Sequence, residues 1–372
     1  MVNLTLAHMT LLSVVGARPN FMKLAPLARA LARRPAVEHV IVHTGQHYDA
    51  EMSDTFFEEL SIPRPQHNLE VGSGSHAAQT AAIMLRFEPV CQAVKPDVVL
   101  VYGDVNSTVA AALVAAKLGT RVAHVEAGLR SRDWTMPEEI NRVVTDRLAD
   151  LLFTPSRDAV ENLRAEGVPD DRIHFVGNIM IDSLVSSLDA ARALAAPRRH
   201  GVEGKRYVLV TLHRPGNVDV PDTLVELLET LAVLSVESPV LFPLHPRTRA
   251  RIQSLGWSAP DGAHLHFLDP LPYLELLSLE FSASLVVTDS GGLQEETTYL
   301  GVPCLTVRPS TERPITCTEG TNRLVAARRE AILSAAREAL AAGSRHPVTI
   351  ERWDGHTAER IAEVLVDGAR YT

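Results

Sequence analysis

The sequence predicts an α/β protein built from two doubly wound, Rossmann-like domains, and three observations support this. The chain has 372 residues, which is more than one hydrophobic core usually organises. Short apolar, β-branched runs alternate with amphipathic stretches of helical length, as in parallel sheets that helices cover on both faces. The alternation stops once near the middle of the chain and then restarts, so each half is expected to carry its own sheet.

The first half contains five strand-like runs separated by helical segments. The expected strands lie at residues 10–15, 37–44, 97–103, 122–128 and 151–156. Apolar residues at helical spacing mark the two clearest helices, with Phe21, Leu24, Ala28 and Leu31 in one and Ile83, Phe87, Val90 and Val94 in the other. The period changes from strand to helix repeatedly, which is typical of a parallel sheet with crossover helices.

The second half repeats this pattern after a break. The stretch ALAAPRRHGVEGKR around His200 is rich in Ala, Pro, Gly and basic residues, and it indicates a helix end followed by a linker. Strands are then expected at residues 207–213, 239–245, 264–269, 284–289 and 303–307. A helix between the first two carries its apolar stripe at Leu224, Leu227, Leu228 and Leu231.

Composition excludes several classes of partner. The net charge of −9 and the pI near 5.9 argue against nucleic-acid binding, which needs a basic face. No apolar run reaches the roughly 18 residues of a membrane span, and the start of the chain lacks a basic leader. The cysteines Cys91, Cys304 and Cys317 form no CxxC pair, so we expect neither a disulfide framework nor a zinc ribbon. A cytoplasmic protein that binds small molecules or its own copies is predicted.

Polar residues follow most of the expected strands, at the sheet edge where ligands of open parallel sheets bind. In the first half these are Arg18, Gln46, His47, Asp104 and Glu126, and in the second half His213, His245 and Ser290. Acids collect in one half, while imidazoles and a glycine turn collect in the other. If the two halves face each other, an interdomain cleft would hold both sets.

The run SLVVTDSGGLQEETTYLGVP, residues 284–303, resembles the sequence around a protease nucleophile. A strand followed by Asp-Ser-Gly-Gly and a helix instead places Ser290, Gly291 and Gly292 at a helix N-terminus, where free N–H groups bind anions. Ser290 serving only as an N-cap is the simpler alternative. A hydrolase elbow would require G-x-S-x-G, which is absent. Arg18, Lys23 and Arg313 are candidates to complete a diphosphate site.

Three further motifs have simple structural explanations, and none of them indicates a metal or a dinucleotide cofactor. His43 and His47 are four residues apart, but Gly45 between them indicates a loop rather than a metal-binding helix face. GARPN after the first strand has a single glycine, so the dinucleotide fingerprint G-x-G-x-x-G is missing. The segment PEEINR can be simply a helix start, with Pro137 at its first position and acids that favour the helix dipole.

Taken together, the motifs resemble one known family. GARPNFMK, TGQHYD, YGDVNST, HVEAGLRS, PEEINR, HRPGNVD, DSGGLQEE and TERPI with GTN occur here in the order and spacing of the non-hydrolysing UDP-N-acetylglucosamine (UDP-GlcNAc) 2-epimerases of bacteria and archaea. The resemblance runs from Gly16 to Asn322. It implies a GT-B fold in which residues 1–190 carry the acid/base carboxylates and residues 200–355 bind UDP. It also implies that the C-terminal helix, residues 356–372, packs back on the first domain.

The resemblance also implies the roles of individual residues. Family members interconvert UDP-GlcNAc and UDP-ManNAc without a cofactor or metal, are typically homodimers, and feed surface-polysaccharide pathways. The implied catalytic residues are Asp104, Glu126, Glu138 and His213. The implied UDP-binding residues are Arg18, Lys23, Ser290, Gly291, Gly292, Glu296 and Arg313, and residues 270–277 match the stretch that borders the uracil. Gln46, Arg214 and His245 match residues of an allosteric UDP-GlcNAc site.

Three positions depart from the family pattern. Gly216 stands where many members have Glu, and Ile315 stands where some have Glu after TERP. Asp49 occupies the position of the second glutamine of the allosteric site, which puts activation by a second substrate molecule in doubt.

The chemistry explains why these residue types are needed. The C2 proton of the sugar is barely acidic, so family members are understood to eliminate UDP to give 2-acetamidoglucal and then to add it back on the other face. Carboxylates move the proton, and the glycine turn with its cations stabilises the departing diphosphate. The alternatives are a hydrolysing relative that releases ManNAc and UDP, a GT-B glycosyltransferase, and a non-catalytic nucleotide-sugar sensor.

Overall fold

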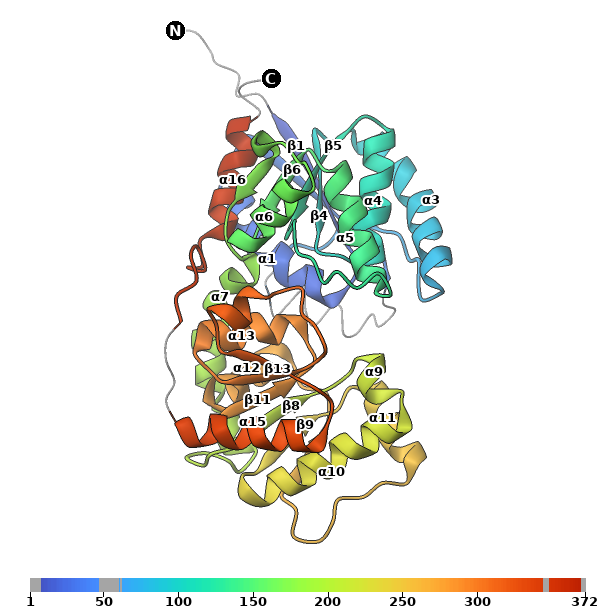
Figure 1. The fold of residues 1–372 in the computed structure, drawn as a ribbon. Coiled ribbons are helices and arrows are strands. Elements are labelled where there is room, and N and C mark those ends of the chain that lie inside the picture. Colours follow the sequence, from blue (N-terminus) through green and yellow to red (C-terminus); the bar gives the residue numbers. More distant parts are fainter. Residues whose placement is uncertain (1–7, 47–59, 61, 344–347, 369–372) are drawn as a thin grey trace. The chain divides into compact units, whose positions relative to one another are not determined.

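The computed structural model describes residues 8–46, 60, 62–343 and 348–368, except for the side chains of Arg18, Asp367 and Gly368. Two compact units make up the chain. The first contains residues 1–183 and 351–372, and the second contains residues 184–350. Each unit is an α/β layer structure of its own (Figure 1).

The first unit is built on a seven-stranded parallel sheet of order β3-β2-β1-β4-β5-β6-β7. Its strands are β1 (Met9–Val15), β2 (Val37–His43), β3 (His67–Asn68), β4 (Val98–Tyr102), β5 (Arg121–Val125), β6 (Leu151–Thr154) and β7 (Ile173–Phe175). Its helices are α1 (Arg18–Ala32), α3 (His76–Val94), α4 (Asn106–Lys117), α5 (Pro137–Leu148), α6 (Arg157–Ala165), the 3₁₀ turn η1 (Asp170–Arg172) and α16 (Thr357–Gly368). Helix α7 (Ile179–Leu194) contains the boundary between the units.

The second unit has a six-stranded parallel sheet of order β10-β9-β8-β11-β12-β13. Its strands are β8 (Val208–Thr211), β9 (Val240–Pro243), β10 (Leu265–Leu268), β11 (Leu285–Thr288), β12 (Cys304–Val307) and β13 (Asn322–Val325). Its helices are α8 (Ala196–Arg199), α9 (Pro215–Val218), α10 (Pro221–Glu237), α11 (Pro246–Leu255), α12 (Tyr273–Ser282), α13 (Gly291–Leu300), α14 (Ile315–Thr318) and α15 (Arg329–Ala342). The predicted doubly wound α/β class is confirmed in both units.

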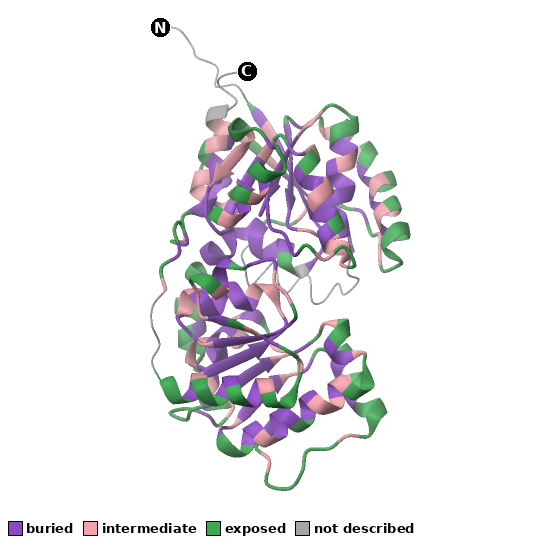
Figure 2. Ribbon diagram, viewed as in Figure 1, coloured by how far each residue is buried: buried purple, intermediate pink, exposed green. Residues whose placement is uncertain are grey.

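The central strands of each sheet, such as β1 and β4 in the first unit and β8, β11 and β12 in the second, are buried on both faces, as their near-continuous apolar runs predict (Figure 2). In β8, Val208 and Val210 belong to one apolar cluster and Leu209 to another, because successive side chains point to opposite faces of a sheet. Helices α10 and α15 contribute to the first cluster, and α12 and α13 to the second. Helices therefore cover both faces of this sheet.

Both sheets reverse their strand order at one point. In the first unit β1 is hydrogen-bonded to β2 and β4, and in the second unit β8 is hydrogen-bonded to β9 and β11. The chain therefore leaves these neighbouring strands in opposite directions, which opens a crevice at their carboxyl ends. Residues that follow β1, β4, β8 and β11 are the ones that such a crevice exposes to a ligand.

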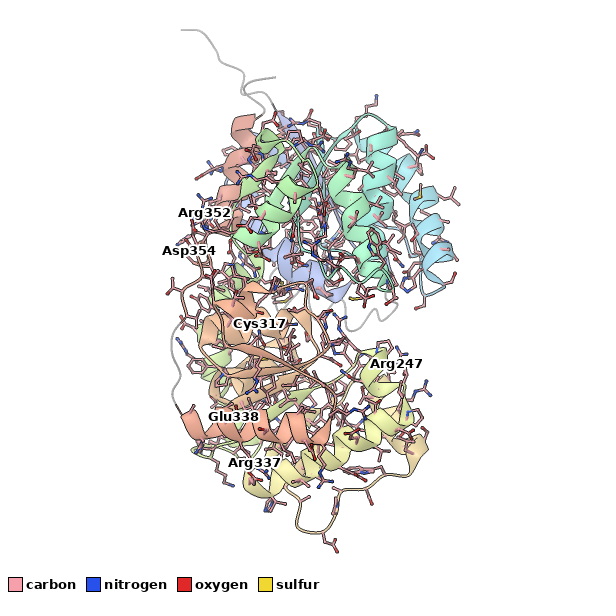
Figure 3. The ribbon with its side chains drawn as sticks, in the orientation of Figure 1. Arg247, Cys317, Arg337, Glu338, Arg352 and Asp354 are labelled. Carbon is pink, nitrogen blue, oxygen red and sulfur yellow. The ribbon has the colours of Figure 1, made fainter. Side chains whose placement is uncertain are left out.

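The chain returns to the first unit after the second unit is complete. Trp353 donates from Nε1 to the carbonyl oxygen of Pro155 at 3.0 Å. Asp182 on α7 accepts hydrogen bonds from the backbone N–H groups of Thr357 and Ala358, at 3.1 and 2.7 Å, and so satisfies donors in the first turn of α16. Helix α16 packs on α1. Figure 3 labels Arg352 and Asp354 in the segment that leads to it.

Among the described helices, none combines the length and the hydropathy that crossing a membrane demands.

Candidate functional site

The turn after β1 is held by Asn20. Its Oδ1 accepts hydrogen bonds from the backbone N–H groups of Gly16 and Ala17, both at 3.3 Å, and its Nδ2 donates to the carbonyl oxygen of Tyr102 at 2.8 Å. One side chain thus ties the end of β1 to the end of β4 across the point of strand reversal. Arg18 is the first residue of α1, and its side chain lies outside the described residues.

Lys23 and Glu126 form a buried ion pair at the same sheet edge. Their Nζ and Oε2 atoms are 2.7 Å apart, and the two side chains are only 5% and 2% exposed. A Cβ atom on Gly103 would lie 2.6 Å from Lys23 Nζ and 3.8 Å from Glu126 Oε1. A larger residue at position 103 would therefore displace the lysine. This ion pair brings together two of the residues that the sequence predicted for the site.

The backbone at Glu126 is strained. Its φ is +76°, in the left-handed region that side chains with a Cβ rarely adopt. Such a conformation costs of order 1–3 kcal/mol and is found where the surrounding structure enforces it, often at functional sites. Here the backbone N–H of Glu126 donates to the carbonyl oxygen of Phe153 at 3.1 Å, which anchors the bend to the neighbouring strand. In this conformation the Glu126 carboxylate leaves the direction of the strand and pairs with Lys23.

Asp104 follows β4 and is connected to α5. Its Oδ2 is 2.6 Å from Nη2 of Arg142, and its carbonyl oxygen accepts a hydrogen bond from Asn141 at 2.9 Å. Arg142 also pairs with Glu139, which is buried. Burial acts to raise the pKa of Glu139, but hydrogen bonds from the backbone of Ser131 and Arg132 and the charge of Arg142 outweigh it and leave the pKa lowered. Helix α5 is thus fixed against the Asp104 turn.

Glu138 is the second residue of α5, and Pro137 occupies the first helical position as predicted. Glu138 is partly exposed. It lies four residues before Arg142, and residues at this spacing share one face of a helix. Glu138 therefore projects from the face of α5 that carries the partner of Asp104.

His124 on β5 is clamped between two acceptors. Its Nδ1 is 2.7 Å from Oδ1 of Asp146, and its Nε2 is 2.7 Å from the carbonyl oxygen of Gly103. Burial acts to raise the pKa of Asp146, but its interactions with His124 and Arg130 outweigh burial and leave the pKa lowered. The carboxylate can then only accept hydrogen bonds. Each ring nitrogen of His124 therefore faces an oxygen, and the ring bridges the Asp146 carboxylate and the Gly103 carbonyl. The His124 ring thereby fixes the carbonyl group of Gly103, the residue that precedes Asp104 in the chain.

Gln46 is turned into the first unit. It is 7% exposed, and its Oε1 accepts hydrogen bonds from Ser107 N and Ser107 Oγ at 3.2 and 2.7 Å. Its side-chain oxygen is therefore used by the start of α4. His47 and Asp49, the other residues singled out in this segment, lie outside the described residues.

In the second unit, Asp289 connects the ends of β8 and β11. It is fully buried and accepts from the backbone N–H groups of His213 and Arg214 and from Asn217 Nδ2, at 3.1, 2.9 and 3.0 Å. Burial raises its pKa, but the hydrogen bond and charge of His213 outweigh this, with Asn217 and Arg214 adding to them, and the net shift is downward. Asp289 is therefore an ionised acceptor at the point of strand reversal.

The His213 side chain is oriented by Asp289. Its Nδ1 lies 3.0 Å from Asp289 Oδ1, and the side chain is 46% exposed. Because the carboxylate can only accept, Nδ1 carries a proton. This is the carboxylate–imidazole arrangement that fixes a catalytic histidine in one tautomer.

The glycine turn after β11 leads directly into α13. Ser290 occupies the N-cap position, but its side chain makes no capping hydrogen bond. Its backbone N–H donates to Thr288 Oγ1 at 3.0 Å. The Ser290 hydroxyl therefore does not cap the helix, and the first N–H groups of α13 retain the polarity that attracts an anion.

Arg313 lies against this turn. A Cβ atom on Gly291 would be 2.7 Å from Arg313 Nη1 and 2.9 Å from Glu312 Oε1, so glycine is required for the approach. Arg313 Nε is 2.8 Å from Glu295 Oε1, and Arg313 Nη1 pairs with Glu312. The guanidinium is only 7% exposed and is held by two carboxylates beside the helix N-terminus.

The remaining predicted residues of the second unit lie around this turn. Glu296 on α13 is 4% exposed and accepts a hydrogen bond from Tyr273 Oη at 2.9 Å. Arg214 donates from Nε to the carbonyl oxygen of Asp289 at 2.9 Å. The ring of His245 lies 6.4 Å from that of His213, centroid to centroid. Of the three departures from the family pattern, two lie in this unit: Gly216 faces open space, and Ile315 is buried at the start of α14.

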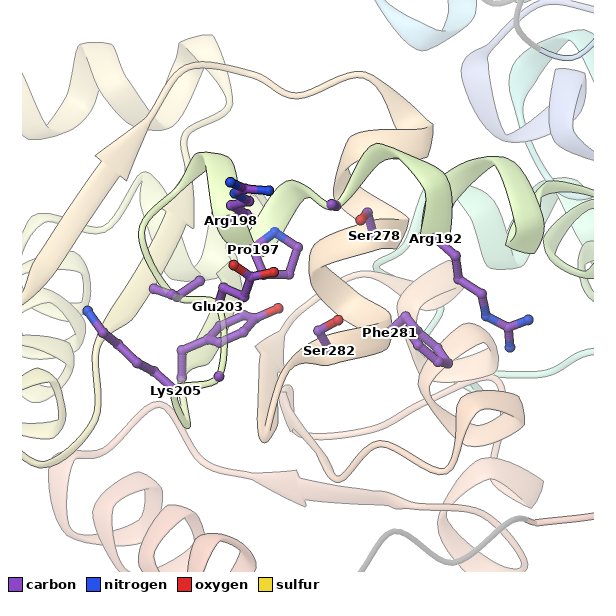
Figure 4. A pocket seen from close by; sticks show the side chains of 12 residues that line it. Arg192, Pro197, Arg198, Glu203, Lys205, Ser278, Phe281 and Ser282 are labelled. Atoms are coloured by element: carbon purple, nitrogen blue, oxygen red, sulfur yellow. The ribbon is translucent and has the colours of Figure 1, made fainter.

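The second unit also contains a cavity of about 320 Å³ that is separate from the site of His213 and Asp289 (Figure 4). Tyr207, Ser278, Phe281 and Ser282 contribute to its wall. Tyr207 precedes β8, and Ser282 ends α12 just before β11, so the cavity lies at the amino ends of these strands. His213 and Asp289 follow the carboxyl ends of the same strands, which excludes the cavity from their site. Among the described residues, no cluster of His, Cys, Asp and Glu could hold a metal ion.

The sequence did not predict Asp289, His124, Asp146 or Arg142 as parts of the site. In the sequence, Asp289 stands out only as the residue before Ser290 in the Asp-Ser-Gly-Gly run. The sequence signal for Asp289 is a polar residue at the end of an apolar strand, and the same signal predicts Asp104 and His213. His124 sits inside a strand and Arg142 inside a helix, where such polar residues cannot be distinguished from solvated ones without their partners.

Comparison with known proteins gives consistent results. A family model described as UDP-N-acetylglucosamine 2-epimerase matches residues 29–366. The chain is 40% identical over 367 residues to the UDP-N-acetylglucosamine 2-epimerase of Methanocaldococcus jannaschii, covering 97% of this chain and 100% of that protein. It is 41% identical over 360 residues to the UDP-2,3-diacetamido-2,3-dideoxy-D-glucuronate 2-epimerase of Pseudomonas aeruginosa, covering 96% and 99%.

A solved structure agrees with the sequence relatives. The crystal structure of Methanocaldococcus jannaschii UDP-GlcNAc 2-epimerase in complex with UDP-GlcNAc and UDP matches with a TM-score of 0.88 at 40% identity, covering 97% of this chain and 100% of that one. The predicted GT-B fold, with two Rossmann-like domains, is confirmed.

Proposed function

The chain belongs to the UDP-N-acetylglucosamine 2-epimerase family, and we propose that it reversibly converts UDP-GlcNAc to UDP-ManNAc by inverting C2 of the sugar. One observation supports this most directly. In the first unit, Asp104 follows β4 and the Lys23–Glu126 pair joins α1 to the end of β5, whereas in the second unit His213 and the glycine turn follow β8 and β11, the strands where the sheet order reverses. Inversion at C2 with a departing diphosphate needs both sets.

In the proposed reaction, a carboxylate of the first unit takes the C2 proton while the bond from C1 to the UDP oxygen breaks. The products of this half-reaction are 2-acetamidoglucal and UDP. Protonation of C2 on the opposite face and return of the UDP oxygen to C1 complete the inversion. Asp104, Glu126 and Glu138 are the proposed acid/base groups, and Lys23 is the ion-pair partner of the buried Glu126.

The second unit is proposed to hold UDP. The N–H groups of Gly291 and Gly292, the Ser290 hydroxyl and Arg313 would surround the diphosphate, and Glu296 would accept hydrogen bonds from the ribose. His213, bonded through Nδ1 to Asp289, is proposed to act as an imidazolium that stabilises the negative charge gathering on UDP as it leaves. Arg18 is proposed as a further cation from the first unit. Gln46, Arg214 and His245 stay predictions for a regulatory site.

Deuterium incorporation tests this function. With UDP-GlcNAc in deuterated water, proton NMR should show UDP-ManNAc appearing and the C2 proton signal of both sugars disappearing. Free UDP should not accumulate. Net release of UDP and ManNAc would indicate the hydrolysing alternative, and epimerisation with the C2 proton retained would rule out the elimination.

Ser290→Ala should weaken UDP binding only modestly and leave epimerisation measurable, because backbone N–H groups and Arg313 still face the diphosphate. The loss of one hydrogen bond to a charged group corresponds to about 1.5–3 kcal/mol. Calorimetric titration of UDP and the NMR assay measure the two effects separately. Complete loss of turnover with unchanged UDP affinity would instead identify Ser290 as a nucleophile.

The sugar can be tested in the same assay. The Pseudomonas aeruginosa relative is named for a 2,3-diacetamido uronate, which shares the UDP group and the C2 acetamido group with UDP-GlcNAc. Running both sugar nucleotides side by side shows which one this chain epimerises faster. Faster conversion of the uronate would move the proposal to that substrate while leaving the C2 chemistry in place.

We further propose a cytoplasmic homodimer that supplies UDP-ManNAc for surface polysaccharides. The three cysteines are free thiols, as a reducing compartment favours. A mainly apolar groove of about 360 Å³ lies between α3 and α5, lined in part by Ala81, Met84 and Ile140. Leu85 beside it on α3 is 73% exposed, and such apolar surfaces mark association sites. Sedimentation of the full chain at two or more concentrations tests the dimer.

A further inference from the structure

Glu280 on α12 is a buried carboxyl group that the proposed mechanism leaves unexplained. It is 0% exposed, and neither of its oxygens receives a hydrogen bond from an N–H or O–H donor of the described residues. An ionised carboxylate buried in this way would cost several kcal/mol, because it has lost water without gaining donors. A protonated carboxyl group avoids most of that cost and itself becomes a donor.

The group that Glu280 faces is Glu296. Helices α12 and α13 pack together, and the side chains of Glu280 and Glu296 are within hydrogen-bonding reach of each other. Tyr273 and Glu280 are seven residues apart on α12 and therefore share one helix face. Tyr273 Oη donates to Glu296 Oε1 at 2.9 Å. Glu296 is thus approached from α12 by two side chains, a phenol and a carboxyl group.

The surroundings of Glu280 supply no compensating cation among the described residues. Beside Glu296 on α13, Glu295 pairs with Arg313. On the side where α8 packs, Glu275 of α12 is the partner of Arg199 and His200. On β12, the neighbouring titratable group is the buried thiol of Cys304, whose pKa is raised by burial.

We propose that Glu280 and Glu296 share one proton and that Glu280 is a positioning residue, holding Glu296 as the acceptor for the ribose hydroxyls of UDP. Glu280 donates to one Glu296 oxygen while Tyr273 donates to the other side of the group. Two donors from one helix face fix the carboxylate plane and leave its remaining lone pairs for the nucleotide. The inference rests on the proposed function, because it assumes that Glu296 binds ribose.

A dependence on pH follows. Burial, together with the charge of Glu296, raises the pKa of Glu280 well above its ordinary value. A carboxyl group whose pKa is raised by folding stabilises the native state at low pH, and this contribution is lost as the pH rises through the raised pKa. Above that point two adjacent carboxylates repel each other, and Glu296 loses its fixed position. UDP affinity should therefore fall with rising pH, by up to about tenfold per pH unit.

Titration of UDP into wild type and Glu280→Gln from about pH 5 to about pH 9, the range in which buried glutamates titrate, tests the inference. A glutamine amide still donates to Glu296 but cannot lose its proton. Its affinity should match that of wild type at low pH and decline less at high pH. Other groups near the diphosphate, His213 included, titrate equally in both proteins, so the ratio of the two affinities isolates the pair. Glu275→Gln on the same helix is the matched control and should follow wild type.

Each outcome decides one question. UDP bound by both proteins with superimposable pH profiles would overturn the shared proton. Failure of wild type to bind UDP at every pH would instead refute the nucleotide site of the proposed function, and with it the role assigned here to Glu280. Infrared difference spectra provide a second readout that needs no ligand. Wild type near neutral pH should show the C=O stretch of a protonated carboxyl group that Glu280→Gln and Glu280→Leu lack, and its absence from wild type would contradict the inference.

Discussion

Glu126→Gln is expected to reduce turnover by roughly 10²–10⁴-fold, the usual contribution of one positioned acid/base group, while UDP still binds to the second unit. The amide can accept a hydrogen bond from Lys23 but cannot take a proton from C2. Single-turnover NMR with UDP-GlcNAc measures the first effect, and calorimetric titration of UDP measures the second.

The Glu126 substitution also leaves Lys23 buried with a neutral partner. Breaking a buried ion pair is strongly destabilising, so the melting temperature should be recorded alongside activity. Glu161→Gln, an exposed glutamate on α6 of the same unit, removes the same charge and should retain wild-type turnover. Turnover within a few fold of wild type in Glu126→Gln would exclude this carboxylate as the acid/base group. Loss of UDP binding would show that the ion pair serves the nucleotide instead.

Asp289→Asn should be the most damaging substitution in the second unit, with turnover lowered by roughly 10²–10⁴-fold. An asparagine amide can donate to Nδ1 of His213 and so reverse the tautomer that the carboxylate imposes. It also removes the negative charge that would stabilise a positively charged imidazole beside the departing diphosphate. A neutral imidazole that carries only its Nε2 proton would then face the diphosphate and would stabilise the departing charge less than an imidazolium.

The control for this prediction is Asp219→Asn. Asp219 lies at the end of α9 in the same unit and pairs with Arg247 and Arg251 away from the turn. Circular dichroism shows whether Asp289→Asn still folds, because the carboxylate also accepts backbone N–H groups. A folded Asp289→Asn protein with unchanged turnover and an unchanged pH profile would contradict the assigned role of Asp289.

The strands and the order of layers could be predicted because they depend on local pattern. The apolar runs at β4 and β11 are continuous over five and three residues, and burial on both faces follows directly. The short strands β3 (His67–Asn68) and β7 (Ile173–Phe175) were not predicted, because two or three residues cannot display a period. They exist because their neighbours in the sheet offer unpaired edges.

A site residue could be predicted only where its position relative to a strand was enough to identify it. Asp104 and His213 follow strands, so the rule for open sheets finds them. The importance of Asp289 depends on donors from residues 213, 214 and 217, more than 70 positions earlier in the chain. The bridging position of His124 depends on a carboxylate from α5 and a carbonyl from the end of β4. No local pattern contains such partners, because folding alone brings them together.

The return of the chain to its first unit has a consequence for biosynthesis. Helix α16 packs on α1, although the whole second unit is synthesised between them. Domains generally fold as they leave the ribosome, so the second unit can reach its native structure while the first still lacks α16 and the strap through Trp353. Until then the apolar surface of α1 that α16 covers is open to solvent. The domain translated first is thus expected to be the last to become complete, and chaperone binding to nascent chains should concentrate on it.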